Sequence, residues 1–133
     1  MSVRYLLDTN AASYAINKKS AAMDRHLAKV PLVELGISAV TEGELRYGAA
    51  RSGSVALQAT VEHFLLGVNI FPWDSRAANE YGELRTTLER EGRLMGSLDM
   101  MIAAHALALG LILITNDRAF GRIKKLKTED WTK

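Results

Sequence analysis

The chain has 133 residues, of which 48% are apolar, so it can bury a substantial core, and we expect residues 1–133 to form a single domain. It contains no cysteine, which excludes disulfides and thiolate metal sites. Its formal net charge of +2 excludes a strongly polybasic nucleic-acid binder and says little else about partners.

Apolar periodicity and turn-forming residues predict strands and helices that alternate along the chain. Helix 99–109 is apolar nearly all round, which is typical of a helix packed between other elements. The order predicts a three-layer α/β/α fold with a mainly parallel central sheet. The expected strands are 3–7, 36–40, 68–71 and 111–115, with a weak final strand near 126–129. The expected helices are 10–17, 20–29, 42–51, 55–66, 75–90 and 99–109.

Two features of the chain bear on its location. The first strand begins almost directly after Met1, which leaves no room for a signal peptide. The longest apolar run, 100–114, contains His105 and Gly110 and is shorter than the ~20 residues that a membrane-spanning helix needs. We therefore expect a cytoplasmic protein with no membrane partner.

Four acidic residues stand where the expected strands end or where the following helices begin: Asp8, Glu44, Asp99 and Asp117. In an open α/β sheet these places converge on one crevice. Four carboxylates there would repel one another unless a hard divalent cation neutralised them, and Mg²⁺ prefers oxygen ligands. The four acids are therefore the candidate metal ligands and catalytic groups of a metal-dependent phosphodiester hydrolase.

Each acid also has an ordinary structural explanation. Asp8 could cap the helix that follows it, Asp99 could complement the dipole of its own helix, and Asp117 could form a turn. Glu44 differs, because no basic residue stands at pairing distance along its helix. Four separate structural explanations at the edge of one sheet are less probable than one shared site.

Residues beside the acids are candidates for supporting roles. Asn10 and Thr115 could hold the carboxylates through hydrogen bonds, although cap and strand-end roles suit them equally. A basic cluster directly after the last acid could be a solvated surface or a rim that binds RNA phosphates. Its members are Arg118, Arg122, Lys124, Lys125 and Lys127.

The histidines and large aromatic residues give weaker signals. His105 lies in an apolar helix with no second ligand at metal-binding spacing, so we interpret it as a packed histidine. Trp73, Trp131 and Tyr47 could stack on nucleobases, but packing within the protein is the favoured interpretation for all three.

Taken together, the motifs resemble the PIN domain of VapC-type toxins along essentially the whole chain. The matching runs are Leu6-Leu7-Asp8-Thr9-Asn10, Thr41 to Gly48, Asp99 with Ile102 to Ala106, Thr115-Asn116-Asp117, and Trp131. The resemblance favours Glu44 over Glu42 as the second acid, because the acid of the family precedes Leu and stands four residues before Gly. This chain departs from many relatives by carrying Gly96-Ser97-Leu98 where they have a proline before the third acid.

The resemblance implies a Mg²⁺-dependent endoribonuclease, for which Mn²⁺ could substitute, from a type II toxin–antitoxin system. It implies an RNA substrate, with the anticodon loop of a tRNA as the first expectation, a VapB-type antitoxin and a homodimer. Such an antitoxin could insert a basic side chain among the four acids. The rest of it would lie along apolar surface of helices 42–51 and 55–66, which includes Leu57, Val61, Phe64 and Leu65, and the same surface could instead form the homodimer.

Three other classes of protein are alternatives to a VapC-type ribonuclease. A phospho-receiver domain needs paired acids after its first strand, and a phosphatase of the Asp-x-Asp type needs a second Asp, whereas Asp8-Thr9-Asn10 supplies one acid. The remaining alternative is a catalytically inactive PIN-like domain that binds RNA or acts as a scaffold. Such domains have usually lost an acid, and all four are present here.

Overall fold

The protein is described by a computed structural model over residues 2–133. Its five short strands form one sheet in the order β3-β2-β1-β4-β5, and every pairing is parallel. A mainly parallel central sheet was predicted, and this is confirmed. The strands are β1 (Tyr5–Leu7), β2 (Leu35–Ser38), β3 (Asn69–Phe71), β4 (Ile112–Ile114) and β5 (Thr128–Glu129).

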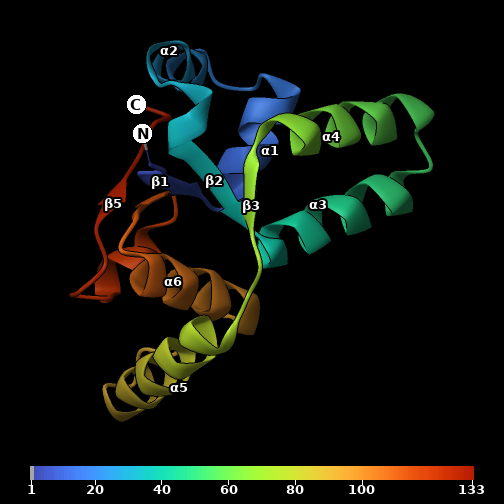
Figure 1. The fold of residues 1–133 in the computed structure, drawn as a ribbon. Coiled ribbons are helices and arrows are strands. Elements are labelled where there is room, and N and C mark those ends of the chain that lie inside the picture. The colour runs from blue at the N-terminus through green and yellow to red at the C-terminus, as the bar shows by residue number, and fades with distance from the viewer. Residues whose placement is uncertain (1) are drawn as a thin grey trace.

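Helices cover both faces of this sheet and make three layers, as Figure 1 shows. Helices α1, α2 and α4 lie on one side of the sheet, and α5 and α6 lie on the other. Helix α3 leaves the end of β2 and runs away from the sheet, and α4 returns toward it. The α-helices are α1 (Thr9–Asn17), α2 (Ala21–Lys29), α3 (Ala39–Ser52), α4 (Val55–Gly67), α5 (Ser75–Arg90) and α6 (Ser97–Leu109). Two short 3₁₀ helices are η1 (Leu32–Glu34) and η2 (Arg118–Arg122).

The alternation of side chains along the strands divides the interior into two cores. Leu7 and Ile114 pack under α1, α2 and α4, whereas Leu6 and Leu113 pack against α5 and α6. All four side chains are buried, because a central parallel sheet has no face in contact with water. This double burial fixes the register of β1 and β4, whose ends carry two of the candidate acids.

Two of the element boundaries that differ from the prediction lie at the starts of the helices that carry Glu44 and Asp99. The second strand ends at Ser38 and not at residue 40, because the Ser38 hydroxyl accepts a hydrogen bond from the Val40 amide and caps α3. Helix α6 begins at Ser97 and not at Asp99, with Gly96 in the cap position. Asp99 consequently lies within the first turn of its helix.

The predicted partner surface on α4 is wrong. Val61 and Leu65 are buried, and Leu57 and Phe64 pack against the same core beneath α1 and α2. The exposed apolar side chains of α4 are others, namely Val55 at 81% and Leu66 at 86% exposure. Among the helices within residues 2–133, none combines the length and apolar character that crossing a bilayer requires.

The close approach of β2 and β3 generates a stability prediction. A Cβ atom at Gly36 would lie 2.7 Å from Phe71 Cε2 and 3.3 Å from the Asn69 carbonyl oxygen. Gly36→Ala should therefore lower the free energy of unfolding by about 1–2 kcal/mol, measured by urea denaturation. Gly82→Ala is the matched control, because a Cβ there meets nothing within 4 Å in α5. That change should stabilise the protein by up to about 1 kcal/mol; equal effects at both positions would contradict the packing argument.

Candidate active site

The four acids converge where the strand order reverses between β1 and β4. Asp8 directly follows β1, and its backbone amide donates to the Ile114 carbonyl oxygen at 3.0 Å. Asp117 follows β4 on the same edge of the sheet. Ligand sites in open α/β sheets form at such a reversal, outside the carboxyl ends of the strands.

Asp8 is the most deeply placed of the four acids, with 4% of its surface exposed. Its Oδ1 accepts a hydrogen bond from the Ala11 amide at 2.8 Å and caps α1. Burial raises the pKa of the Asp8 carboxyl from 3.8 to about 6, and the charges of Asp99 and Asp117 add to the rise. Hydrogen bonds from Thr115 and Ala11 act in the opposite direction. Asp8 therefore carries a charge that the fold alone only partly stabilises.

Asp99 is linked to the remaining acids by charge. Partial burial is the main cause that raises its pKa, followed by repulsion from Asp117 and then from Glu44. Asp99 and Asp8 repel each other as well. Each of the four carboxylates is therefore repelled by at least one of the others, and together they make one electronegative site.

Glu44 reaches this site from α3 through a hydroxyl that sequence reasoning missed. Thr9 Oγ1 donates to Glu44 Oε1 at 2.5 Å, and the Thr41 hydroxyl lies 3.3 Å from Thr9 Oγ1. The only signal for Thr9 was its place directly after Asp8, in the first turn of α1. The hydrogen bond connects the helix that follows β1 to the helix that follows β2.

Glu42 is engaged elsewhere. Its Oε2 accepts from Arg46 Nε at 3.1 Å, and Arg46 also pairs with Glu62 on α4. Glu42 and Arg46 stand four residues apart and form an i,i+4 pair along α3. This arrangement makes Glu42 part of the link between α3 and α4, whereas Glu44 belongs to the acidic site.

The structural roles proposed as alternatives for Asp8 and Asp117 are also present. Asp8 caps α1, and Asp117 Oδ1 accepts from the Ala119 amide at 2.9 Å and caps η2. In Asp117 this bond occupies one carboxylate oxygen. Capping and membership of the acidic site are therefore compatible, and each helix start holds a carboxylate at the edge of the sheet.

Thr115 and Asn10, the two candidate supporting residues, differ in their surroundings. Thr115 is buried, hydrogen-bonds to Asp8 and accepts from the Asp117 amide at 3.0 Å, so it connects two acids. Asn10 is exposed, and within residues 2–133 its side chain makes no hydrogen bond to the protein. A supporting role for Asn10 stays a prediction.

His105 is buried, as predicted for a packed histidine, and it joins the two helices that carry Glu44 and Asp99. Its Nδ1 lies 2.8 Å from the hydroxyl of Ser38, the residue that caps α3. Burial lowers the pKa of His105, so the ring is neutral at physiological pH. The pair fixes the start of α3 against the middle of α6.

The large aromatic residues have three different environments. Trp131 is buried against Tyr5, and Trp73 Nε1 donates to the Met101 carbonyl oxygen at 3.0 Å. Packing was the favoured interpretation for both tryptophans, and it is confirmed. For Tyr47 it is wrong, because 65% of its surface is exposed.

The acids interact through charge at distances longer than those of metal ligands. Within residues 2–133, no three His, Asp or Glu side chains lie close enough together to hold one ion. Three of the carboxylates accept hydrogen bonds from the protein: Asp8 from Ala11, Glu44 from Thr9 and Asp117 from Ala119. The donor set consists of carboxylate oxygens and so suits Mg²⁺.

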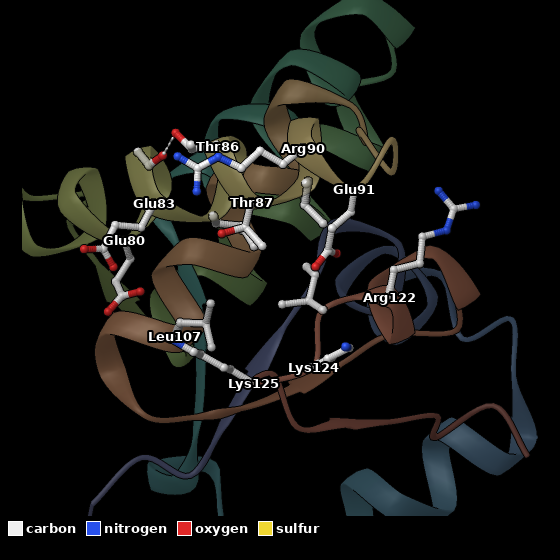
Figure 2. A pocket seen from close by; sticks show the side chains of 14 residues that line it. Glu80, Glu83, Thr86, Thr87, Arg90, Glu91, Leu107, Arg122, Lys124 and Lys125 are labelled. Atoms are coloured by element: carbon white, nitrogen blue, oxygen red, sulfur yellow. Dashed lines mark hydrogen bonds between the residues drawn. The ribbon is translucent and has the colours of Figure 1, made fainter.

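One surface pocket does not contain the acids. It has a volume of about 520 Å³ and lies between α5 and the segment after η2, as Figure 2 shows. Three of the predicted RNA-binding residues, Arg122, Lys124 and Lys125, line it opposite Glu80 and Glu83 of α5. Lys127 and Arg118 do not line it, and Arg118 directly follows Asp117 in η2. The pocket is therefore a separate feature, and RNA binding by this cluster stays a prediction.

The chain is similar in sequence and fold to known proteins. Residues 5–126 match the family model of the PIN domain. The tRNA(fMet)-specific endonuclease VapC of Shigella flexneri is 38% identical over 98% of this chain and 99% of that protein. Ribonuclease VapC2 of Rickettsia felis is 36% identical over 97% of this chain and 98% of that protein.

Solved structures give the same result. The structure of VapBC2 from Rickettsia felis bound to a promoter DNA fragment has a TM-score of 0.87 and 36% identity. It is matched over 97% of this chain and 99% of that chain. The DNA-bound VapBC of Salmonella typhimurium has a TM-score of 0.86 and 34% identity, over 97% and 98% of the two chains. The protein therefore belongs to the PIN domain family and, within it, to the VapC ribonucleases.

The raised pKa of Asp8 generates a prediction about stability and pH. The folded protein holds a proton on Asp8 up to about pH 6, whereas the unfolded chain releases it near 3.8, so this group destabilises the fold as pH rises through that window. A rise from 3.8 to about 6 corresponds to about 3 kcal/mol. With chelator present, Asp8→Asn should therefore stabilise the protein by about 1–3 kcal/mol near pH 7.5, because Asn also caps helices well.

The gain from the same variant should be smaller near pH 4.5, because the window between the unfolded pKa of 3.8 and the folded pKa of about 6 is then only partly crossed. Chemical denaturation at both pH values measures the difference. A gain that is equal at both pH values would contradict the repulsion described for this site.

Proposed function

We propose that this protein is a Mg²⁺-dependent endoribonuclease toxin of a type II toxin–antitoxin system, in which Mn²⁺ can substitute for Mg²⁺. The observation that carries the proposal is the convergence of Asp8, Glu44, Asp99 and Asp117 at the reversal of the strand order. Repulsion among these carboxylates supports the proposal. A divalent cation would neutralise the negative charge that no basic side chain of the site neutralises. The names of the Shigella and Rickettsia relatives support the reaction class.

The four acids would have different roles in binding the cation. Asp8 and Asp99 would hold the cation, and Glu44, after rotating away from Thr9, and Asp117 would complete its surroundings or hold its waters. When bound, such an ion supplies the positive charge that acidifies an attacking water and stabilises the charge on a phosphodiester. Thr115 would keep Asp8 and Asp117 in place through its two hydrogen bonds.

The substrate we propose is RNA, with a tRNA anticodon loop as the first candidate. The Shigella relative is named as an endonuclease specific for tRNA(fMet). An unpaired loop suits an open site at a sheet edge, because its bases can be splayed out of the stack. Both the RNA and a protein inhibitor would be met in the cytoplasm.

The partner we propose is a VapB-type antitoxin, and we propose a homodimer of this chain. The neighbouring Rickettsia and Salmonella structures are VapBC complexes, which supports the antitoxin. A basic side chain of the antitoxin, inserted among the four acids, would replace the charge of the cation and satisfy the carboxylate oxygens. Metal and inhibitor would then compete for the same site.

The metal proposal predicts a coupled change in stability and cleavage. Mg²⁺ should raise the unfolding temperature of the wild-type protein, with weaker binding below about pH 6 because Asp8 must lose its proton. Asp99→Asn should abolish both the thermal shift and the cleavage of RNA. Glu42→Gln is the control and should retain both, because Glu42 pairs with Arg46 outside the site.

Thermal unfolding with and without Mg²⁺, and gel analysis of a tRNA mixture, measure these outcomes. A wild-type protein that binds RNA but neither binds Mg²⁺ nor cleaves would favour the inactive RNA-binding or scaffold alternative. Cleavage by Asp99→Asn at the wild-type rate would remove this acid from the mechanism.

RNA capture by the basic cluster predicts a change in salt dependence. If Arg118 and Arg122 contact phosphates, changing both to Gln should weaken binding of single-stranded RNA regardless of sequence. Each lost contact should reduce the slope of log K against log salt by about 0.7. Fluorescence anisotropy over a salt series measures the slope, and an unchanged slope would assign both residues to the solvated surface.

A further inference from the structure

Beside the acidic site, α3 presents an aromatic ring to solvent. Tyr47 stands three residues after Glu44, so the two side chains lie on the same side of the helix, one turn apart. Side chains on a helix lean toward its N-terminus, which directs the ring of Tyr47 back over Gly43 and Glu44. Helical spacing therefore puts the ring on the face of α3 that carries Glu44.

Tyr47 is unusual among the aromatic residues of this protein. Its side chain is 65% exposed. Within residues 2–133 the contacts between aromatic rings involve other residues: Tyr5 and His26 with Trp131, Phe71 with His105, and Trp73 with Tyr81. A tyrosine ring left in water contributes little to the stability of the fold. The packing of the chain gives no reason for this ring at this position.

Two glycines leave the surroundings of the ring open. Gly43 and Gly48 lie inside α3, and a Cβ atom at either would meet nothing within 4 Å. A glycine inside a helix costs about 1 kcal/mol relative to alanine. Internal packing does not require these two glycines, and their missing side chains leave room for a ligand against the backbone beside Tyr47.

Two exposed apolar side chains stand in the segment that leads to Asp99. Leu98, which directly precedes Asp99, is an exposed large hydrophobic residue, as is Leu94 in the preceding loop. Arg51, one turn beyond Tyr47 on α3, is exposed and free of the ion pairs that hold Arg46. A flat apolar ring beside a phosphate-processing site, with a cation one turn further, matches the chemistry of a single-stranded nucleotide.

From this arrangement we infer that Tyr47 is a stacking platform for a nucleobase of the RNA substrate, next to the bond at the acidic site. The inference rests on the proposed ribonuclease function and adds to it a base-binding subsite on α3. Stacking on an aromatic ring suits unpaired bases, and it tolerates different bases because each has a π-face. Tyr47 would thus hold one splayed base while the acids hold the neighbouring phosphate through the cation.

The test is binding of a single-stranded RNA of about ten nucleotides that contains one 2-aminopurine, in an Asp99→Asn background that prevents cleavage. Tyr47→Ala should weaken binding by about tenfold or more and reduce the quenching of the 2-aminopurine fluorescence. Tyr47→Phe, which keeps the ring, should bind within about twofold of the parent. The slope of log K against log salt should not change in either variant, because no phosphate contact is lost.

Two controls separate stacking from other roles of this surface. Leu66→Ala removes another exposed apolar side chain of the α3–α4 hairpin and should leave RNA binding unchanged. The unfolding temperature of Tyr47→Ala should match that of the parent, because the ring is mostly exposed. An RNA with an abasic site at each position in turn should lose affinity at one position with the parent and at none with Tyr47→Ala.

Several outcomes would overturn the inference. Wild-type affinity in Tyr47→Ala, or a loss as large in Tyr47→Phe, would exclude stacking by the ring. Loss of inhibitor binding with unchanged RNA binding would assign the residue to a protein partner instead. Failure of the proposed function looks different, because the parent itself would then bind no RNA and the wild-type protein would cleave none.

Discussion

Repulsion among four carboxylates at one edge of a parallel sheet is the constraint on which the rest of this structure depends. Asp8 is buried there with a pKa raised to about 6, and Asp99 is raised by burial and by its acidic neighbours. A fold selected for stability alone would not gather like charges in this way. Repulsion at this edge lowers the free energy of unfolding, and the cation that we propose would raise it again.

The scaffold holds these charges in place with short polar contacts rather than with ion pairs. Thr9 reaches Glu44, Thr115 joins Asp8 to Asp117, and His105 ties the cap of α3 to α6. None of these contacts neutralises a carboxylate, so the negative potential survives. In contrast, Glu42 is neutralised by Arg46 outside the site.

The strands, the helices and the four acids could be predicted because each has a local signal. Apolar runs marked the buried strands; Asp8 and Asp117 stood where two of those runs ended, and Glu44 and Asp99 stood early in predicted helices. The early end of β2 at Ser38 and the start of α6 at Ser97 were missed, because caps move a boundary by a few residues without changing the apolar pattern. Thr9 and the Ser38–His105 contact could not be predicted, since they join residues distant in sequence through tertiary packing. The exposed position of Tyr47 was missed because an aromatic residue in a helix resembles a core residue until its face is known.

The central claim is that Asp8, Glu44, Asp99 and Asp117 together hold one or more divalent cations. The most direct test is a crystal structure of the protein with Mn²⁺, read from the anomalous difference map. The account predicts a peak between the carboxylates of Asp8 and Asp99, with Glu44 turned away from Thr9. A saturating soak with no peak at this edge of the sheet, or a peak elsewhere on the molecule, would contradict it.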